Sequence, residues 1–189
     1  MVVSLSLLTH RLVLRGFEEA DLAPVQSYAS DPRLPGHVDW GPSSEEEAWD
    51  FVRSAIASQS TNPRKRFDFA ILLRGEEALM GGCGLNVSAD NDHEASIGCF
   101  IAYDYRGQGY ATEAAYRLLA FGFRELGLHR TVAICDPENV ASWRVLEKIG
   151  MRREGYLVEE RWQRWRWRDS LLYAILEQEW ARAKTGAVG

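Results

Sequence analysis

One ten-residue stretch constrains this chain more than any other: YRGQGYATEA, residues 105–114. It places two glycines in a turn, and apolar residues then recur at helical spacing from Ala111 until Gly127, which ends the predicted helix. Glycines that open a helix leave backbone N–H groups bare at the positive end of the helix dipole, which suits a bound anion. The stretch therefore predicts an anion-binding junction between a strand and a helix, with an ordinary strand-to-helix turn as the alternative.

Two common phosphate-binding motifs do not fit this turn. A Walker loop needs four residues between its glycines and then Lys with Ser or Thr, and this turn lacks that arrangement. A dinucleotide fingerprint needs Gly or Ala where this chain has Thr112, and it follows a parallel strand, whereas the segments before this turn resemble hairpins. The remaining interpretation is a pyrophosphate-binding nest with the spacing Arg106, Gly109, Ala111.

Apolar periodicity along the rest of the chain predicts one mixed sheet of about seven strands with helices on its faces. The predicted strands are RLVLRGF, three hairpin segments between residues 67 and 103, TVAIC, MRREGYLVEE and SLLYAILEQEW. The predicted helices lie within residues 18–31, from an N-cap at Ser43 or Ser44 to about Ala57, after Gly109, and over residues 140–149. We expect residues 1–189 to form a single α/β (α+β) domain, in which residues 31–44 form a loop over the site.

Charge and cysteine usage narrow the range of partners. The net charge of −5 disfavours nucleic acid and anionic membranes, so any polyanion must be held by a local arrangement of donors. Cys83, Cys99 and Cys135 are far apart and flanked by apolar residues, which indicates reduced core thiols in a cytoplasmic protein. The histidines are scattered as well, so we expect no metal site. The apolar N-terminus lacks a basic start, and charge follows too soon for a membrane span.

A series of ordered motifs resembles the GCN5-related N-acetyltransferase (GNAT) family, in particular the RimJ/RimL-like branch of ribosomal-protein alanine N-acetyltransferases. The resemblance covers nearly the whole chain, through THRLVLRGF, WGP, IGCFIAYDYRGQGYATEA, GLHR, DPENVASWRVLEKIGMRREG and RDSLLYAILEQEW. It implies a mainly antiparallel sheet with a bulged strand before the cofactor loop. It also implies transfer of an acetyl group from acetyl-CoA, by direct attack, to a primary amine of a protein N-terminus or a small molecule.

The resemblance further assigns the cofactor contacts to the bulged strand, the glycine loop and the start of the following helix. These residues are Phe100, Ile101, Ala102, Arg106, Gly107, Gln108, Gly109, Tyr110, Ala111, Thr112, Asn139 and Ser142. Asn139 follows DPE at the start of a helix, where it serves as an N-cap, as a contact to the pantetheine arm, or as both. Arg144 and Lys148 either contact the outer phosphate of the cofactor or form a solvated helix face.

Acetyl transfer to an amine needs a group that accepts the amine proton and a donor to the departing thiolate. Ser142 is the candidate donor by resemblance. Members of this branch often carry Glu just before the Ile-Gly pair of the bulged strand, but this chain has Ser96 there and Glu94 two residues earlier. The candidate bases are therefore Glu160 and Glu94, each with a plain surface carboxylate as the alternative.

The segment RWQRWRWRD, residues 161–169, interleaves tryptophan with arginine. If it is a strand, Trp165 and Trp167 share one face and the arginines the other. It is then a wall of the acceptor groove, a subunit interface of a homodimer, or an ordinary strand with core and rim residues. Two rival functions stay open: a catalytically silent CoA-binding module, and an RNA-associated protein whose bases stack on the tryptophans.

Overall fold

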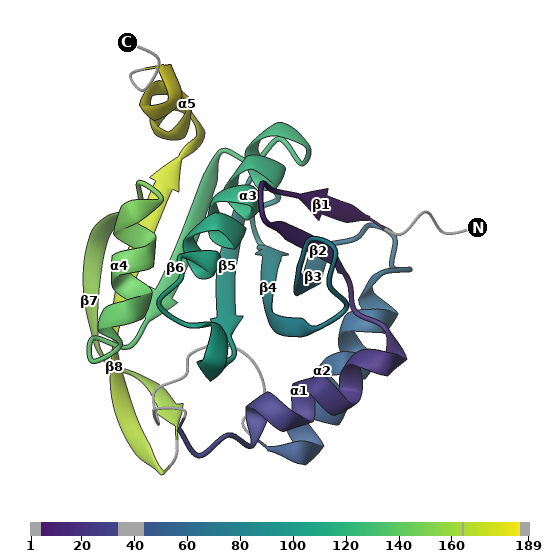
Figure 1. The fold of residues 1–189 in the computed structure, drawn as a ribbon. Helices are drawn as coiled ribbons and strands as arrows, with labels where there is room; N and C mark the ends of the chain where they lie inside the picture. The colour runs from purple at the N-terminus through teal and green to yellow at the C-terminus, as the bar shows by residue number, and fades with distance from the viewer. Residues whose placement is uncertain (1–4, 34–43, 164, 186–189) are drawn as a thin grey trace.

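The computed structural model describes residues 5–33, 44–163 and 165–185. At its centre lies one twisted sheet of eight strands in the order β1-β2-β3-β4-β5-β6-β8-β7 (Figure 1). The strands are β1 (Ser6–Leu8), β2 (Leu12–Gly16), β3 (Arg66–Leu73), β4 (Leu79–Val87), β5 (Glu94–Ile101), β6 (Arg130–Cys135), β7 (Arg152–Gln163) and β8 (Arg166–Leu176). All neighbouring strands pair antiparallel except β5 and β6, which are parallel. The predicted mixed, mainly antiparallel sheet is confirmed.

The described helices are α1 (Leu22–Ala29), α2 (Glu45–Ser58), α3 (Tyr110–Arg124), α4 (Val140–Lys148) and α5 (Glu177–Thr185), with short 3-10 turns at Glu19–Asp21 and Tyr103–Tyr105. The side chain of Ser44 accepts a hydrogen bond from the Glu47 N–H (3.1 Å), so Ser44 is the N-cap of α2. Three glutamates in its first turn complement the helix dipole. Ser43 lies outside the described residues, as does most of the expected loop, residues 34–43.

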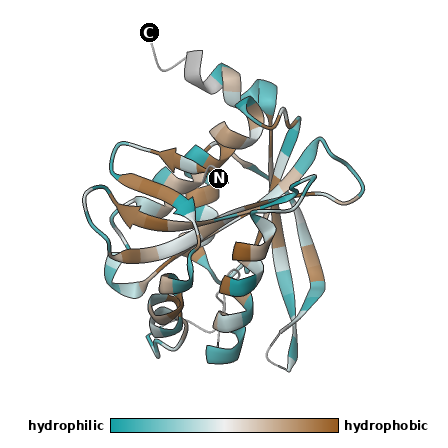
Figure 2. Ribbon diagram, turned by 90° about the vertical axis from the view of Figure 1, so that its right-hand side faces the viewer, coloured by the Kyte–Doolittle hydropathy of each residue, from teal (hydrophilic) through white to brown (hydrophobic). Residues whose placement is uncertain are grey.

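Helices cover both faces of the sheet, and each face has its own apolar core. Alternate residues of β3 divide between these cores: Phe69 and Ile71 pack with α3 and α4, whereas Ala70 and Leu72 pack with α1 and α2. Figure 2 shows apolar residues gathered on the strands, while the connecting loops are mostly hydrophilic. The glycine turn at residues 107–109 leads directly into α3, so the chain enters the face that α3 and α4 cover.

The two ends of the chain depart from the sequence-based expectation. The segment before RLVLRGF contains a further strand, β1, whose three residues are too few to produce a readable alternation. The last predicted strand ends at Leu176, because α5 begins at Glu177; the prediction of a strand up to Trp180 was wrong. A carboxylate oxygen of Glu179 accepts from the Leu176 N–H (2.8 Å), and Trp180 packs beside Phe123 of α3 (ring centroids 5.5 Å apart).

The sheet separates between β5 and β6. These strands pair over only three residues each, from Glu94 to Ser96 and from Arg130 to Val132, and their carboxyl ends then part. The expected bulge is not seen in the pairing of β5 with β4, which keeps one register along its whole length. The separation arises instead because β6 continues its pairing with β8 on its other side.

Candidate functional site

A cavity of about 630 Å³ occupies the separation between β5 and β6. Its walls come from β5, the glycine loop, the first turn of α3, the end of β6, the exposed side of α4, and Arg161 of β7. All the predicted cofactor residues line it except Ala102 and Gln108. The sequence alone did not single out Ala133, Ile134 and Ala141, since small apolar residues on a strand and a helix carry no distinctive signal.

The glycine loop has the backbone geometry expected of an anion nest. Gly107 and Gly109 have φ of +77° and +83°, in the left-handed region that favours glycine. Gly109 is also the N-cap of α3 and supplies no side chain to cap it. Among the described residues, the backbone N–H groups of residues 107–112 have no hydrogen-bond acceptor. Such a row of bare donors at the positive end of a 15-residue helix is suited to a phosphate group.

Arg11, the residue just before β2, contacts the glycine loop and the first turn of α3. Its Nη1 donates to the Gln108 carbonyl (3.1 Å), its Nε donates to Glu113 of α3 (2.6 Å), and its guanidinium lies 4.5 Å from the centre of the Tyr110 ring. Glu113 also accepts from the Thr9 hydroxyl (2.6 Å). Burial raises the pKa of Glu113, but the hydrogen bonds from Thr9 and Arg11 outweigh it and leave this pKa below its usual value. Sequence reasoning missed this support because Arg11 and Glu113 lie 102 residues apart.

The backbone of β5 presents alternate residues to the cavity. Ala102 donates its N–H to a carbonyl of β4 (2.8 Å), and its own carbonyl accepts from the following turn (3.0 Å). Because neighbouring residues of a strand point opposite ways, Phe100 also faces β4, whereas Cys99 and Ile101 direct their backbone groups to the open side. There the Ile101 carbonyl accepts from Arg106 Nε (3.0 Å). Of the three residues expected to offer backbone groups, Ile101 is the one whose groups face the cavity.

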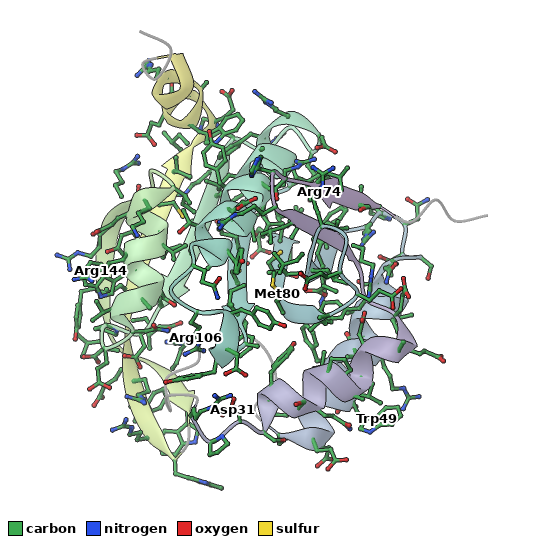
Figure 3. All side chains as sticks on the ribbon, viewed as in Figure 1. Asp31, Trp49, Arg74, Met80, Arg106 and Arg144 are labelled. Atoms are coloured by element: carbon green, nitrogen blue, oxygen red, sulfur yellow. The ribbon has the colours of Figure 1, made fainter. Side chains whose placement is uncertain are left out.

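Arg106 borders the cavity where β5 ends, and Figure 3 shows it on the same side of the molecule as Asp31, at the end of α1. Its guanidinium also lies 5.6 Å from the centre of the Phe100 ring. Burial lowers the pKa of Arg106, and the nearby Tyr103 and Asp31 partly offset this effect. A partly desolvated cation beside the nest is a suitable counter-charge for an anionic ligand.

The start of α4 forms the opposite wall. Asn139 is the N-cap, and its side-chain oxygen accepts from the Ser142 N–H (3.2 Å). Both residues line the cavity, so capping does not exclude a ligand contact. The turn before the cap is braced from β8: Arg168 contacts Asp136 at 3.5 Å and donates to Glu138 (3.1 Å).

The three candidate catalytic side chains occupy different places. Ser142 lines the cavity. Glu160, on β7, does not line the cavity; its carboxylate accepts from the Ser170 hydroxyl (2.9 Å), and its neighbour in sequence, Arg161, does line it. Glu94 lies where β5 and β6 are still paired, forms an ion pair with Arg130 (2.9 Å), and is not part of the cavity wall.

The tryptophan-rich segment is a hairpin rather than a single strand. Trp165 has a φ of +63° and lies in the turn between β7 and β8, with 90% of its surface exposed. The prediction that it shares a strand face with Trp167 was therefore wrong. Trp162 pairs with Trp167 instead, with ring centroids 5.4 Å apart, because these two residues are opposite each other in the register.

Two properties of the described residues concern metal ions and membranes as partners. No group of three or more potential ligands from His, Cys, Asp and Glu is placed to hold a metal ion in that part of the chain. Within the same residues, no helix has both the length and the apolar character that crossing a membrane requires.

Comparisons with known proteins agree with this geometry. Residues 11–152 match the family described as "Acetyltransferase (GNAT) domain". The chain is 39% identical over 172 residues to the uncharacterized N-acetyltransferase YnaD of Bacillus subtilis, covering 91% of this chain and 97% of that protein. It is 25% identical over 187 residues to the [ribosomal protein uS5]-alanine N-acetyltransferase of Escherichia coli, covering 95% and 94%.

A similar fold is seen in the solved structure of RimL, a ribosomal L7/L12 alpha-N-protein acetyltransferase in complex with coenzyme A. The TM-score is 0.78 at 21% identity, with 91% of this chain and 98% of RimL covered. The family match spans well over half of the chain, and the expected resemblance is confirmed. The protein belongs to the GNAT family of acetyltransferases.

Proposed function

We propose that this protein is an acetyl-CoA-dependent N-acetyltransferase that acetylates a primary amine, in particular the α-amine of a protein. One observation carries the proposal: a nest of bare N–H groups opens directly into the cavity between β5 and β6. The nest fits a pyrophosphate, and the cavity has the largely apolar walls that suit a pantetheine arm. The relatives named for ribosomal proteins support a protein α-amine as the acceptor. The three free cysteines fit a cytoplasmic location.

Bound acetyl-CoA would supply an activated thioester carbonyl. Backbone donors of β5 at Cys99 and Ile101 face the cavity and can polarise this carbonyl as the amine attacks. The hydroxyl of Ser142, on the opposite wall, can donate a hydrogen bond that stabilises the departing thiolate, which takes its proton from solvent. In this scheme the acetyl group passes straight from sulfur to nitrogen.

The protonation state of the Cys99 thiol argues against a mechanism in which this residue is acetylated as an intermediate. Burial raises the pKa of Cys99 to about 12. Such a thiol stays almost entirely protonated at pH 7, and the thiolate is the nucleophile. Direct transfer predicts that mass spectrometry of the enzyme mixed with acetyl-CoA alone finds no acetylated cysteine; stoichiometric labelling of Cys99 would contradict it.

We propose Glu160 as the group that accepts the amine proton, directly or through water. Ser170 donates to its carboxylate, which also lies 3.4 Å from Nε of the wall residue Arg161, whereas Glu94 pairs with Arg130 where β5 and β6 are still joined. Glu160→Gln should lower kcat about 10²-fold and flatten its rise with pH, because general-base catalysis contributes roughly 10²–10⁴-fold. Glu159→Gln, one residue away and exposed, is the control. A wild-type pH profile in Glu160→Gln would remove it as the base.

The direct test of the function is thiol release from acetyl-CoA with a panel of acceptors. The panel contains peptides with free N-termini, the same peptides with blocked N-termini, a polyamine and an aminoglycoside. We expect turnover with free N-termini and none with the blocked peptides. Binding of acetyl-CoA without turnover on any amine would instead support the silent CoA-binding module.

A further inference from the structure

The charges around the cavity are of one sign. Among the described residues that line it, the charged side chains are Arg106, Arg144, Lys148 and Arg161, and none is a carboxylate. Arg144 and Lys148 belong to α4 and border the part of the cavity assigned to the anionic cofactor, whereas Arg106 follows β5 and lies against Phe100, a residue of the core that α1 and α2 cover. Arg161 differs from them, since it reaches the cavity from β7.

Arg161 also comes from the other face of the sheet. Tyr173 of β8 donates to Glu147 of α4 (3.2 Å) and packs in the core that contains the α3 side chains. Side chains alternate along β8, so Ser170 points to the opposite face. Arg161 donates to the Ser170 hydroxyl (2.9 Å), which places its stem on that opposite face. Helices α3 and α4 and the Arg161 side chain thus meet the cavity from opposite faces of the sheet, and Arg161 lies on the side left for the acceptor.

A small polar network holds the Arg161 guanidinium in place. Ser170 is fully buried and its hydroxyl connects the two side chains, accepting from Arg161 Nε and donating to Glu160 (2.9 Å). The same Nε lies 3.4 Å from the Glu160 carboxylate. The Arg161 side chain is only 24% exposed. A guanidinium with a fixed plane and restricted hydration is a selective partner for a carboxylate.

We propose that Arg161 determines acceptor specificity by binding a carboxylate that the acceptor carries close to its reacting amine. This inference rests on the proposed N-acetyltransferase function and names its substrate class. The carboxylate belongs to an acidic side chain near a peptide N-terminus or to the α-carboxylate of a free amino acid. The cationic walls repel polyamines, and they also lower the pKa of a nearby acceptor amine, which favours its neutral, reactive form.

The test compares acceptors that differ only in this carboxylate. Peptides that begin Ala-Glu, Ala-Gln or Ala-Lys test for recognition of a side-chain carboxylate. Free alanine, compared with alaninamide, tests for recognition of an α-carboxylate. The enzymes are wild type, Arg161→Gln, Arg161→Lys and the control Arg166→Gln, which removes a charge from an exposed position of the same hairpin outside the cavity wall. Thermal unfolding of each variant checks its fold.

We expect wild type to favour the carboxylate-bearing acceptor in kcat/KM by about tenfold or more, since a charged hydrogen bond discriminates on this scale. Arg161→Gln should abolish the preference, Arg161→Lys should keep part of it, and Arg166→Gln should keep all of it. The KM for acetyl-CoA should stay unchanged in all three variants.

Three results would overturn the role of Arg161: no preference in wild type, a preference that survives in Arg161→Gln, or a tenfold higher KM for acetyl-CoA in that variant. Binding of the same peptides, labelled at their C-termini, to the CoA-loaded protein separates this inference from the proposed function. Arg161-dependent binding without acetyl transfer supports the inference and contradicts the function. Acetylation without any preference does the reverse.

Discussion

At the scale of single residues, the site depends on two glycines whose backbone conformation other residues rarely adopt. Gly107 and Gly109 turn the chain so that consecutive N–H groups face the same space at the start of α3. A side chain at Gly109 would have room, since an added Cβ would lie 3.5 Å from Arg11 Nη2. The requirement for glycine there is therefore conformational rather than steric.

Gly109→Ala should raise the KM for acetyl-CoA, because alanine resists a positive φ at a cost of roughly 1–2 kcal/mol and the nest relaxes to avoid it. Gly75→Ala is a matched control: its φ is +84° and an added Cβ meets nothing within 4 Å. Both variants should lose similar stability in urea unfolding, but only Gly109→Ala should bind acetyl-CoA several-fold more weakly. Equal cofactor affinity in both would contradict the nest.

The Arg11 and Glu113 pair should make loop stability depend on acidity. The pKa of Glu113 lies below its usual value of 4.5 in the folded protein, so its contribution is complete above about pH 4.5 and is lost as the pH falls through the lowered pKa. Glu113→Gln should cost about 1 kcal/mol at neutral pH. Below pH 4 its unfolding curve should approach that of wild type; a constant difference from pH 3 to 7 would contradict this account.

At the scale of elements, the cavity exists because β5 pairs with β4 along its whole length but pairs with β6 only over its first three residues. The pairing of β5 with β6 stops after Ser96, whereas β6 stays paired with β8 up to Cys135. The pairing of β5 with β4 includes a close backbone approach at Gly81, opposite Ile101. A Cβ at Gly81 would lie 2.1 Å from the Phe100 carbonyl oxygen. Strand β5, which carries the proposed thioester contacts, is therefore positioned by a glycine on its neighbour.

Gly81→Ala should displace β5, since the contact is with backbone and cannot be relieved by a side-chain rotation. We expect a loss of about 1–3 kcal/mol in urea unfolding and a fall in kcat of tenfold or more. Gly155→Ala on β7 is the control, because its nearest contacts would be ordinary ones at 3.8 Å or more. Wild-type kcat in a folded Gly81→Ala enzyme would show that β5 does not need this approach.

At the scale of the whole molecule, the proposed function places the two substrates on opposite faces of the sheet. The glycine loop and α4 offer the cofactor one face, and Glu160 and Arg161 on the β7 and β8 hairpin approach from the other. In this proposal the two substrates meet in the gap where the carboxyl ends of β5 and β6 have separated. A ligand that fills this gap contacts several elements at once and should stabilise the whole fold.

Acetyl-CoA at 100 times its dissociation constant should add about 2.7 kcal/mol to the free energy of unfolding. For a chain of 189 residues this corresponds to a Tm increase of roughly 5–10 °C, measurable by calorimetry. ATP, which is also a polyanionic adenine nucleotide but has no pantetheine arm to fill the cavity, should raise Tm much less at the same concentration. Equal shifts for both ligands would indicate that the cavity stays empty.

Features that depend on neighbours in the chain were readable from the sequence. The glycine spacing at residues 107–112, the Asn139 cap and the Ser44 cap each involve residues a few positions apart, and backbone conformation and capping act over that range. The ordered motifs added the sheet architecture and the expected cofactor. The short β1 and the change from β8 to α5 were missed, because their local patterns are weak or misleading.

The sequence by itself thus determined the glycine-rich junction before α3 and the family to which the chain belongs. Only the tertiary structure decided where β5 and β6 part, which of the β5 backbone groups face the gap, and that Arg11 braces the loop from 102 residues away. It also decided which face Arg161 occupies. These features depend on strand register and on contacts between distant segments, and a one-residue change of register would reverse the direction of every side chain on a strand.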